Sequence, residues 1–167
     1  MSSHSSRYHP VVARITGLLD ASGCSYETFA HEPVRTSEEA ARTRPGYGLH
    51  QGAKALIVRT KGPGSAQDFL MLVFPAHRKL DSKKAKAALG VNDLRFASET
   101  EVAERTDGVE VGGVPPFGNL FGLPVIADPG LFENERIVFN AGDRRFSVAM
   151  RSDDYRRLVE PRVLEIV

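Results

Sequence analysis

Apolar residues near the start of the chain recur first with a helical period and then with a strand period. One helical stripe is formed by Val11, Ile15, Leu18 and Leu19. The pattern predicts a helix that begins at Pro10 and ends at Gly23. Residues 25–31 (SYETFAH) then alternate as in a strand, and the spacing of Thr36 and Glu39 predicts the capped start of a short helix.

Two apolar runs dominate the middle of the sequence. Residues 53–60 (AKALIVRT) and 68–76 (DFLMLVFPA) flank a loop rich in turn residues, which predicts an antiparallel hairpin. A helix is expected over 80–90, capped by Asp81 or Ser82, and another over 98–108, capped by Ser98. A short strand, LRFAS, lies between them.

The last third contains three further strand-like runs, at 123–128, 136–142 and 146–151, and a helix over 152–160 with Ser152 as its predicted cap. Strands and helices do not alternate regularly along the chain. We therefore predict an α+β fold (mixed α/β) with a central, mixed and largely antiparallel sheet surrounded by short helices, rather than a doubly wound parallel sheet.

The overall totals narrow the class of protein. A chain of 167 residues suits one domain, here residues 10–167, after a polar and flexible tail at 1–9. A net charge of +1 argues against a generally basic nucleic-acid-binding protein. No apolar run approaches the roughly 20 residues of a membrane span, and a single cysteine fits a reducing cytoplasm, so we expect a cytoplasmic protein without membrane contact.

The sequence offers few candidate residues for a metal site or for nucleophilic catalysis. The five histidines lack the spacing that places two ligands on one helix face, and one cysteine cannot form a thiolate cluster. Cys24 is interpreted as a small buried residue at a helix–strand junction. We expect neither a metal nor a cofactor, and the sequence does not assign a role to His77.

Three features are open to both a structural and a functional interpretation. The segment VGGVPPFGN, residues 111–119, is either a tight turn or a stiff loop whose main chain meets a small ligand, because its glycines expose the backbone and its prolines fix it. Lys54 lies either on a solvated face or in a pocket where it attracts an anion. The basic run over 77–86 is either a solvated helix face or a contact surface for phosphates.

Several short segments, taken in order, resemble the YbaK family of free-standing trans-editing proteins, which are related to the editing insertion of bacterial prolyl-tRNA synthetase. The matching segments are HEP at 31–33, TSEEAA at 36–41, AKALIV at 53–58, LDSKKAKAALG at 80–90, VGGVPPFG at 111–118 and NAG at 140–142. The resemblance covers most of the chain and implies the family's fold.

The same resemblance implies a function, which is hydrolysis of the ester bond of mischarged aminoacyl-tRNA without a metal. The expected amino acid is small, such as alanine or cysteine, on tRNA-Pro or a related tRNA. The family's lysine matches Lys54, and its glycine-x-x-x-proline loop matches Gly112 to Pro116. We take Lys54, Gly112 and Pro116 as the catalytic candidates.

Substrate-binding candidates follow from the same motifs. They are His31, Gly113, Val114, Pro115, Gly118, Asn140 and Gly142. His31 lines the pocket or serves as a turn residue. Ala55, Pro115 and Asn140 stand where relatives often carry hydroxyl residues, which leaves the amino-acid specificity open.

Two other functions fit the sequence. One is a non-catalytic module that binds the tRNA end or a synthetase, and a pocket filled by Phe117 or Phe121 would favour it. The other is a hydrolase of a small aminoacyl ester. The expected partners are aminoacyl-tRNA and prolyl-tRNA synthetase, and the sequence leaves the oligomeric state open.

Overall fold

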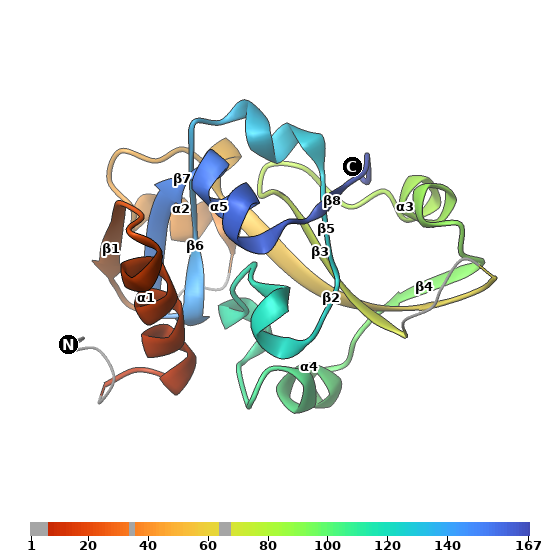
Figure 1. Cartoon of the computed structure of the whole chain (residues 1–167), viewed down its shortest axis with the longest axis horizontal. Helices are drawn as coiled ribbons and strands as arrows, with labels where there is room; N and C mark the ends of the chain where they lie inside the picture. The colour runs from red at the N-terminus through yellow and green to blue at the C-terminus, as the bar shows by residue number, and fades with distance from the viewer. Residues whose placement is uncertain (1–6, 34–35, 64–67) are drawn as a thin grey trace.

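The protein, described by a computed structural model over residues 7–33, 36–63 and 68–167, contains two β-sheets with short helices around them (Figure 1). The smaller sheet has the strand order β1-β7-β6 and is antiparallel throughout. Its strands are β1 (Tyr26–Ala30), β6 (Arg136–Asp143) and β7 (Phe146–Arg151). Helix α1 (Pro10–Ser22) packs on β6.

The larger sheet has the order β4-β2-β3-β5-β8. Its strands are β2 (Ala53–Lys61), β3 (Phe69–Pro75), β4 (Asp93–Phe96), β5 (Val125–Ala127) and β8 (Arg162–Val163). Strands β2 and β3 form the predicted hairpin, whose residues 64–67 lie outside the described part, whereas β5 pairs in parallel with β3 and β8. The prediction of a mixed, largely antiparallel α+β fold is confirmed, with the strands divided between two sheets rather than joined in one.

The remaining helices begin where the predicted caps place them, with one exception. They are α2 (Ser37–Arg42), α3 (Ser82–Leu89), α4 (Glu99–Arg105) and α5 (Ser152–Val159), and the 3₁₀ turns are η1 (Leu49–Gln51), η2 (Val111–Gly113), η3 (Gly118–Phe121) and η4 (Pro129–Glu133). Thr36, Asp81 and Ser98 each accept a backbone N–H at their helix start. Ser152 does not cap α5, because its hydroxyl donates to the Asn134 carbonyl instead.

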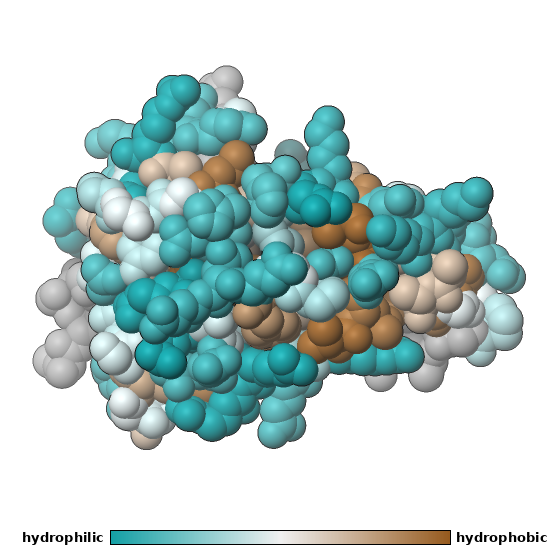
Figure 2. Space-filling view, turned by 90° about the horizontal axis from the view of Figure 1, so that it is seen from above, coloured by the Kyte–Doolittle hydropathy of each residue, from teal (hydrophilic) through white to brown (hydrophobic). Residues whose placement is uncertain are grey.

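Strand β3 separates two hydrophobic cores, and all seven of its residues are buried. Met71 and Val73 face the larger core, which fills the space between the two sheets and α1. Leu72 and Phe74 face the smaller core beneath α3. Seen from above, the surface is mostly polar, and apolar residues gather on the half that holds the five-stranded sheet (Figure 2).

The two sheets meet at one edge through a parallel bridge between Gly52 and Val138. Among the described residues this is the one isolated bridge outside the named strands. Two positions further along each strand come Lys54 on β2 and Asn140 on β6. Because the bridge is parallel, Lys54 and Asn140 both follow it in the same direction along neighbouring strands.

The part of the predicted tail that the structure describes contacts the folded body. The Tyr8 ring lies 5.0 Å from that of Phe146, and His9 Nδ1 accepts the Val11 N–H at the start of α1. Residues 1–6 lie outside the described residues. No helix in the described part of the chain is both long and apolar enough to cross a membrane.

Candidate functional site

Two of the predicted site residues meet through a direct hydrogen bond. Asn140 Nδ2 on β6 donates to the Gly112 carbonyl, 2.7 Å away. Gly112 belongs to η2, which packs against β6, although 28 residues separate the two in the sequence. The NAG segment and the glycine–proline loop are thus parts of one site.

A further predicted residue reaches Asn140 through a serine on the neighbouring strand. Ser147 on β7 pairs with Asn140 in the sheet register, and its hydroxyl lies 3.1 Å from Asn140 Oδ1. His31 Nε2 lies 2.8 Å from the same hydroxyl, while His31 Nδ1 lies 2.9 Å from the Glu32 carbonyl. The structure therefore places His31 beside the site, behind Ser147.

The end of the glycine–proline loop is anchored in the larger core. Val114, Pro115 and Pro116 are buried, and the fully buried Tyr155 of α5 donates its hydroxyl to the Pro116 carbonyl at 2.7 Å. Burial raises the pKa of Tyr155, so the phenol stays protonated and keeps donating. This anchor and the prolines together hold the loop in one conformation.

Two of the predicted binding glycines have packing reasons to be glycine. A Cβ on Gly118 would lie 2.7 Å from Val125 Cγ2 and 2.8 Å from the Leu123 carbonyl oxygen. A Cβ on Gly142, where φ is +108°, would lie 2.7 Å from Val11 Cγ1. Both positions therefore bring backbone close to a neighbouring element, whatever they contribute to binding.

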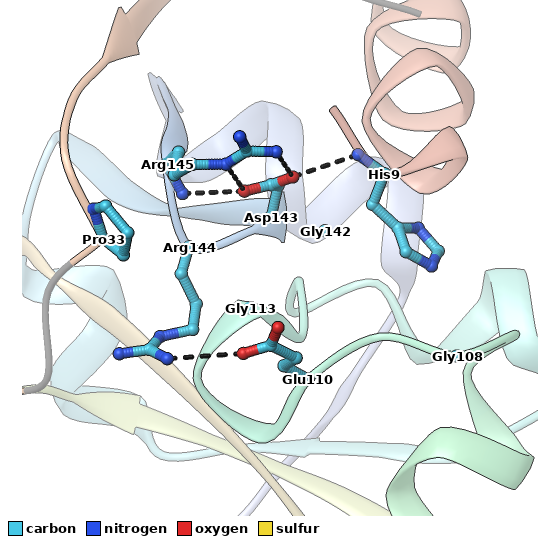
Figure 3. Close-up of a pocket in the computed structure, with 9 residues that line it drawn as sticks. All are labelled: His9, Pro33, Gly108, Glu110, Gly113, Gly142, Asp143, Arg144 and Arg145. Atoms are coloured by element: carbon cyan, nitrogen blue, oxygen red, sulfur yellow. Dashed lines mark hydrogen bonds and ion pairs between the residues drawn. The ribbon is translucent and has the colours of Figure 1, made fainter. Parts of the chain in front are cut away.

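A polar hollow with a volume of about 240 Å³ opens beside η2 (Figure 3). It is lined by His9, Pro33, Gly108, Glu110, Gly113, Gly142, Asp143, Arg144 and Arg145. Figure 3 shows Arg144 reaching toward Glu110, and their Nη1 and Oε2 atoms are 3.3 Å apart. The hollow is smaller than the roughly 300–1,000 Å³ of pockets for drug-sized ligands, and its size suits a small chemical group.

A charged pair, Arg145 and Asp143, lies in the lining of this hollow. Arg145 donates from Nε and Nη2 to the two carboxylate oxygens of Asp143, both at 3.0 Å. Burial acts to raise the pKa of Asp143, but the hydrogen bonds from the Arg145 side chain and from the backbone N–H groups of Arg145 and His9 outweigh it and lower the pKa to about 2. Asp143 is therefore a fixed anion that orients Arg145, rather than a proton donor near neutral pH.

An apolar hollow with a volume of about 360 Å³ lies on the other side of η2. Val111 and Val114 line it together with Ala55 and Ile57 of β2, whereas Glu110 and Gly113 line the polar hollow. Phe96, with 60% of its surface exposed, stands at its edge. The loop thus separates a recess lined by several charged residues from a recess lined mainly by apolar residues.

Lys54 lies on β2 with its side chain exposed, and it does not line either of these two hollows. It pairs with Phe74 in the β2–β3 register and makes no hydrogen bond or ion pair to any described residue. Its side chain is exposed to solution. Its catalytic role stays a prediction, as do the roles of Gly112 and Pro116.

Five residues that support this site were not predicted from the sequence. They are Arg44, Tyr155, Asp143, Arg144 and Ser147. The run DRR, residues 143–145, follows the NAG segment directly, and charged residues next to a candidate site are a signal that the sequence does contain. Arg44 and Tyr155 gave no such signal, because nothing in the local sequence shows that they are buried.

Metal ligands do not gather in the described residues. Over residues 7–33, 36–63 and 68–167, no group of three or more His, Cys, Asp or Glu is placed to hold a metal ion. His50 and His77 approach each other, with ring centroids 6.4 Å apart, but no third ligand joins them in this part of the chain.

Residues 31–158 match the aminoacyl-tRNA editing domain family. The chain belongs to that family. The match spans the Asn140–Gly112 contact, the loop and Lys54, and it confirms the resemblance found in the sequence. It also fits the assignment of the chain to the hydrolases that act on aminoacyl-tRNA.

Relatives of this editing domain occur both as separate proteins and within larger ones. The chain is 36% identical to the multifunctional Ser/Thr-tRNA deacylase ProXp-y of Escherichia coli K12, over 90% of this chain and 89% of that protein. It is 30% identical to a proline–tRNA ligase of Ralstonia pickettii over 60% of this chain, which corresponds to only 17% of the ligase.

A solved structure described as a candidate trans-editing enzyme for prolyl-tRNA synthetase has the same fold as this editing domain. Its TM-score is 0.80 at 25% sequence identity, and the match covers 95% of this chain and 97% of that one. The crystal structure of the hypothetical protein APE2540 matches with a TM-score of 0.78 at 23% identity, over 92% and 98% of the two chains. These likenesses confirm the fold.

Proposed function

We propose that this protein is a trans-editing deacylase that removes a small amino acid from mischarged tRNA. The observation that carries the proposal is the hydrogen bond from Asn140 to the Gly112 carbonyl, which joins two motifs of the editing domain beside the polar hollow. Family membership supports the reaction class.

The reaction needs positioning more than a strong nucleophile, because an aminoacyl ester is already activated. Water attacks the carbonyl carbon, the bond from that carbon to the ribose oxygen breaks, and the ribose oxygen takes up a proton. The vicinal ribose hydroxyl is close enough in the substrate to assist. The protein's contribution is then to hold the ester, the attacking oxygen and the developing oxyanion in a fixed arrangement.

The main chain of the loop supplies fixed hydrogen-bonding groups for this task. The Gly112 and Pro116 carbonyls are held by Asn140 and Tyr155, and the Gly113 N–H donates to the Glu110 carbonyl at 2.8 Å. The N–H of the buried Val114 donates to no other described residue. We assign the Gly112–Pro116 backbone to the aminoacyl group and Lys54 to the terminal phosphate or ribose edge.

The amino acid removed belongs to the small class. The sequence resemblance pointed to alanine or cysteine, whereas the E. coli relative is named for Ser/Thr-tRNA. A recess of about 240 Å³ excludes large side chains by steric clash, but one methyl group more or less changes affinity by only about 1–3 kcal/mol. We therefore propose activity on seryl- and threonyl-tRNA as well as on alanyl- and cysteinyl-tRNA.

The structure gives less support to a non-catalytic binding module. Phe117 is fully buried against Phe139 and Tyr155, with ring centroids 5.5 and 5.4 Å apart, and it does not line the polar hollow. Phe121 lies beneath the Arg14 guanidinium and does not line it either. The hollow is thus open to a substrate group.

A hydrolysis panel tests the proposal. Alanyl-, cysteinyl-, seryl- and threonyl-tRNA are each incubated with the wild type, with Lys54→Ala and with Lys61→Ala, a control at the far end of the same strand. We expect kcat/KM to fall about 10–100-fold in Lys54→Ala alone, which corresponds to one lost hydrogen bond to a charged group. Full activity of Lys54→Ala would remove the lysine from the mechanism, and a wild type that hydrolyses none of the four would refute the function.

A further inference from the structure

Arg44 is a buried cation that no carboxylate among the described residues neutralises. Only 6% of its surface is exposed, and its described partners are the neutral Ser147 Oγ and Asn140 Oδ1. Burial lowers the pKa of Arg44 to about 10, still well above neutral pH, so the charge is kept. A buried charge without a counter-ion destabilises a fold, and an apolar side chain would fill the same space at lower cost.

The guanidinium connects two strands at one point. Its Nε donates to Ser147 on β7 at 3.0 Å and its Nη2 donates to Asn140 on β6 at 2.9 Å. Ser147 and Asn140 are direct partners in the β6–β7 register. A planar fork can donate in two directions at once, which the single ammonium of a lysine cannot do in the same geometry.

This contact fixes which way the Asn140 amide faces. Because Oδ1 accepts from Arg44, Nδ2 must lie on the opposite side, where it donates to the Gly112 carbonyl. The reversed amide would set its NH₂ group against the guanidinium and its oxygen against the Gly112 oxygen. Neither of those contacts is a hydrogen bond.

Ser147 cannot replace Arg44 in this role. Its hydroxyl carries one proton, which Asn140 Oδ1 and His31 Nε2 both approach closely enough to accept. When the proton turns toward His31 Nε2, the Arg44 bond alone still holds Oδ1. Arg44 therefore contributes more than Ser147 to the orientation of the Asn140 amide.

We propose that Arg44 is a positioning residue for deacylation, one that acts through the Asn140 amide on the Gly112 peptide and so on the loop that holds the ester. This inference rests on the proposed function. It assigns Arg44 no contact with the substrate, which separates its expected kinetic signature from that of Lys54. Loss of Arg44 lowers kcat and leaves KM close to its original value.

The first test compares turnover of acylated tRNA by the wild type, Arg44→Met, Arg44→Lys and Ser147→Ala. Arg42→Met is the matched control, because Arg42 is exposed at the end of the neighbouring helix α2. We expect kcat to fall about 10²-fold in both Arg44 variants, the effect of a small misplacement of reacting groups, with a smaller loss in Ser147→Ala. Turnover by the Arg44 variants equal to that of Arg42→Met would overturn the inference.

A double-mutant cycle tests whether Arg44 acts through Asn140. If it does, adding Arg44→Met to Asn140→Ala changes kcat no further, whereas losses that multiply would show independent roles and overturn the inference. Methylguanidinium added to Arg44→Ala provides a second measurement if Arg44→Met folds poorly. We expect it to restore kcat in Arg44→Ala but not in Asn140→Ala, and equal or absent rescue in both would count against the proposal.

Failure of the proposed function and failure of this inference alone give different results. An inactive wild type on every acylated tRNA would overturn the proposed function, and this inference with it. An active wild type with unaffected Arg44 variants would overturn this inference alone.

Discussion

At the scale of single residues, the charged groups around the polar hollow differ in how firmly they are held. Asp143 has 11% of its side chain exposed and receives hydrogen bonds from the Arg145 side chain and from the His9 and Arg145 backbone. The Glu110–Arg144 pair is more exposed on the Glu110 side, at 76%. Ion pairs in solvent contribute little to stability, so of these two carboxylates Asp143 is the one whose loss matters more to the fold.

The depressed pKa of Asp143 predicts an acid-dependent loss of stability. The pKa lies at about 2 in the folded protein against 3.8 without these contacts, so the stabilisation is present above about pH 4 and is lost as the pH falls from there through 2. We expect Asp143→Asn to lower the free energy of unfolding by about 1 kcal/mol at pH 7, after allowance for solvent screening. The difference from the wild type should become small near pH 2 and vanish below it.

Urea unfolding at a series of pH values measures this effect. The control is Asp93→Asn, at an exposed position on β4, which should follow the wild type at every pH. A deficit in Asp143→Asn that stays constant from pH 7 to pH 2 would contradict the electrostatic explanation and point to packing.

At the scale of elements, the bulge in β6 brings that strand against the start of α1. The register shifts between Asn140 and Asp143, and Gly142 lies within the shift at a φ of +108°. Only glycine takes this conformation without strain, and Val11 occupies the space where a side chain would stand. The bulge also turns the chain from Asn140 at the loop toward Asp143 at the hollow.

Two glycine substitutions should therefore have opposite effects. Gly142→Ala combines backbone strain with a clash and should destabilise the protein by about 1–3 kcal/mol. Gly17→Ala lies within α1, where a new Cβ meets no atom within 4 Å, and should stabilise it by up to about 1 kcal/mol. Thermal or urea unfolding of the pair checks this, and equal stabilities would be inconsistent with the described approach of α1 to β6.

Local sequence signals predicted the starts of helices correctly where the capping interaction is itself local. Capping by Thr36, Asp81 and Ser98 depends on residues three apart, so the sequence contains the whole interaction. Ser152 failed as a predicted cap because its hydroxyl is used by Asn134, 18 residues away. The division of the strands into two sheets was missed for the same reason, since it depends on pairings such as that of β1 with β7.

At the scale of the whole molecule, the candidate site could be predicted only in part. The motifs identified Lys54, Asn140 and the loop, but their support comes from Arg44 and Tyr155, which reach the site from 96 and 39 residues away. No periodicity or motif records such contacts, because they exist only after the strands have paired. The sequence thus pointed to the candidate site residues but not to the buried residues that support them.

The near-neutral charge of the molecule bears on how it captures RNA. Exposed basic residues occur at 78, 79, 83 and 84, around the start of α3, although the net charge is only +1. If tRNA is the substrate, the logarithm of kcat/KM should fall linearly with the logarithm of salt concentration, by roughly 0.7–0.9 for each phosphate contacted. A small aminoacyl ester without phosphates should show a nearly flat dependence.

Initial rates on both substrates from low to high potassium chloride distinguish the two cases. Replacement of the four basic residues by glutamine should flatten the slope for tRNA and leave the small ester unchanged if this surface contacts the backbone. Equal slopes for the two substrates would instead favour the small-ester hydrolase.

The Gly52–Val138 bridge has a consequence for how such proteins diversify. On the proposed mechanism, the cation that receives the nucleotide end belongs to the five-stranded sheet, while the amide that sets the loop belongs to the three-stranded sheet. Mutations in the three-stranded sheet can then alter which amino acid is accepted without changing how the nucleotide end is bound. Amino-acid selectivity and nucleotide binding can then be engineered separately, one from each side of the seam.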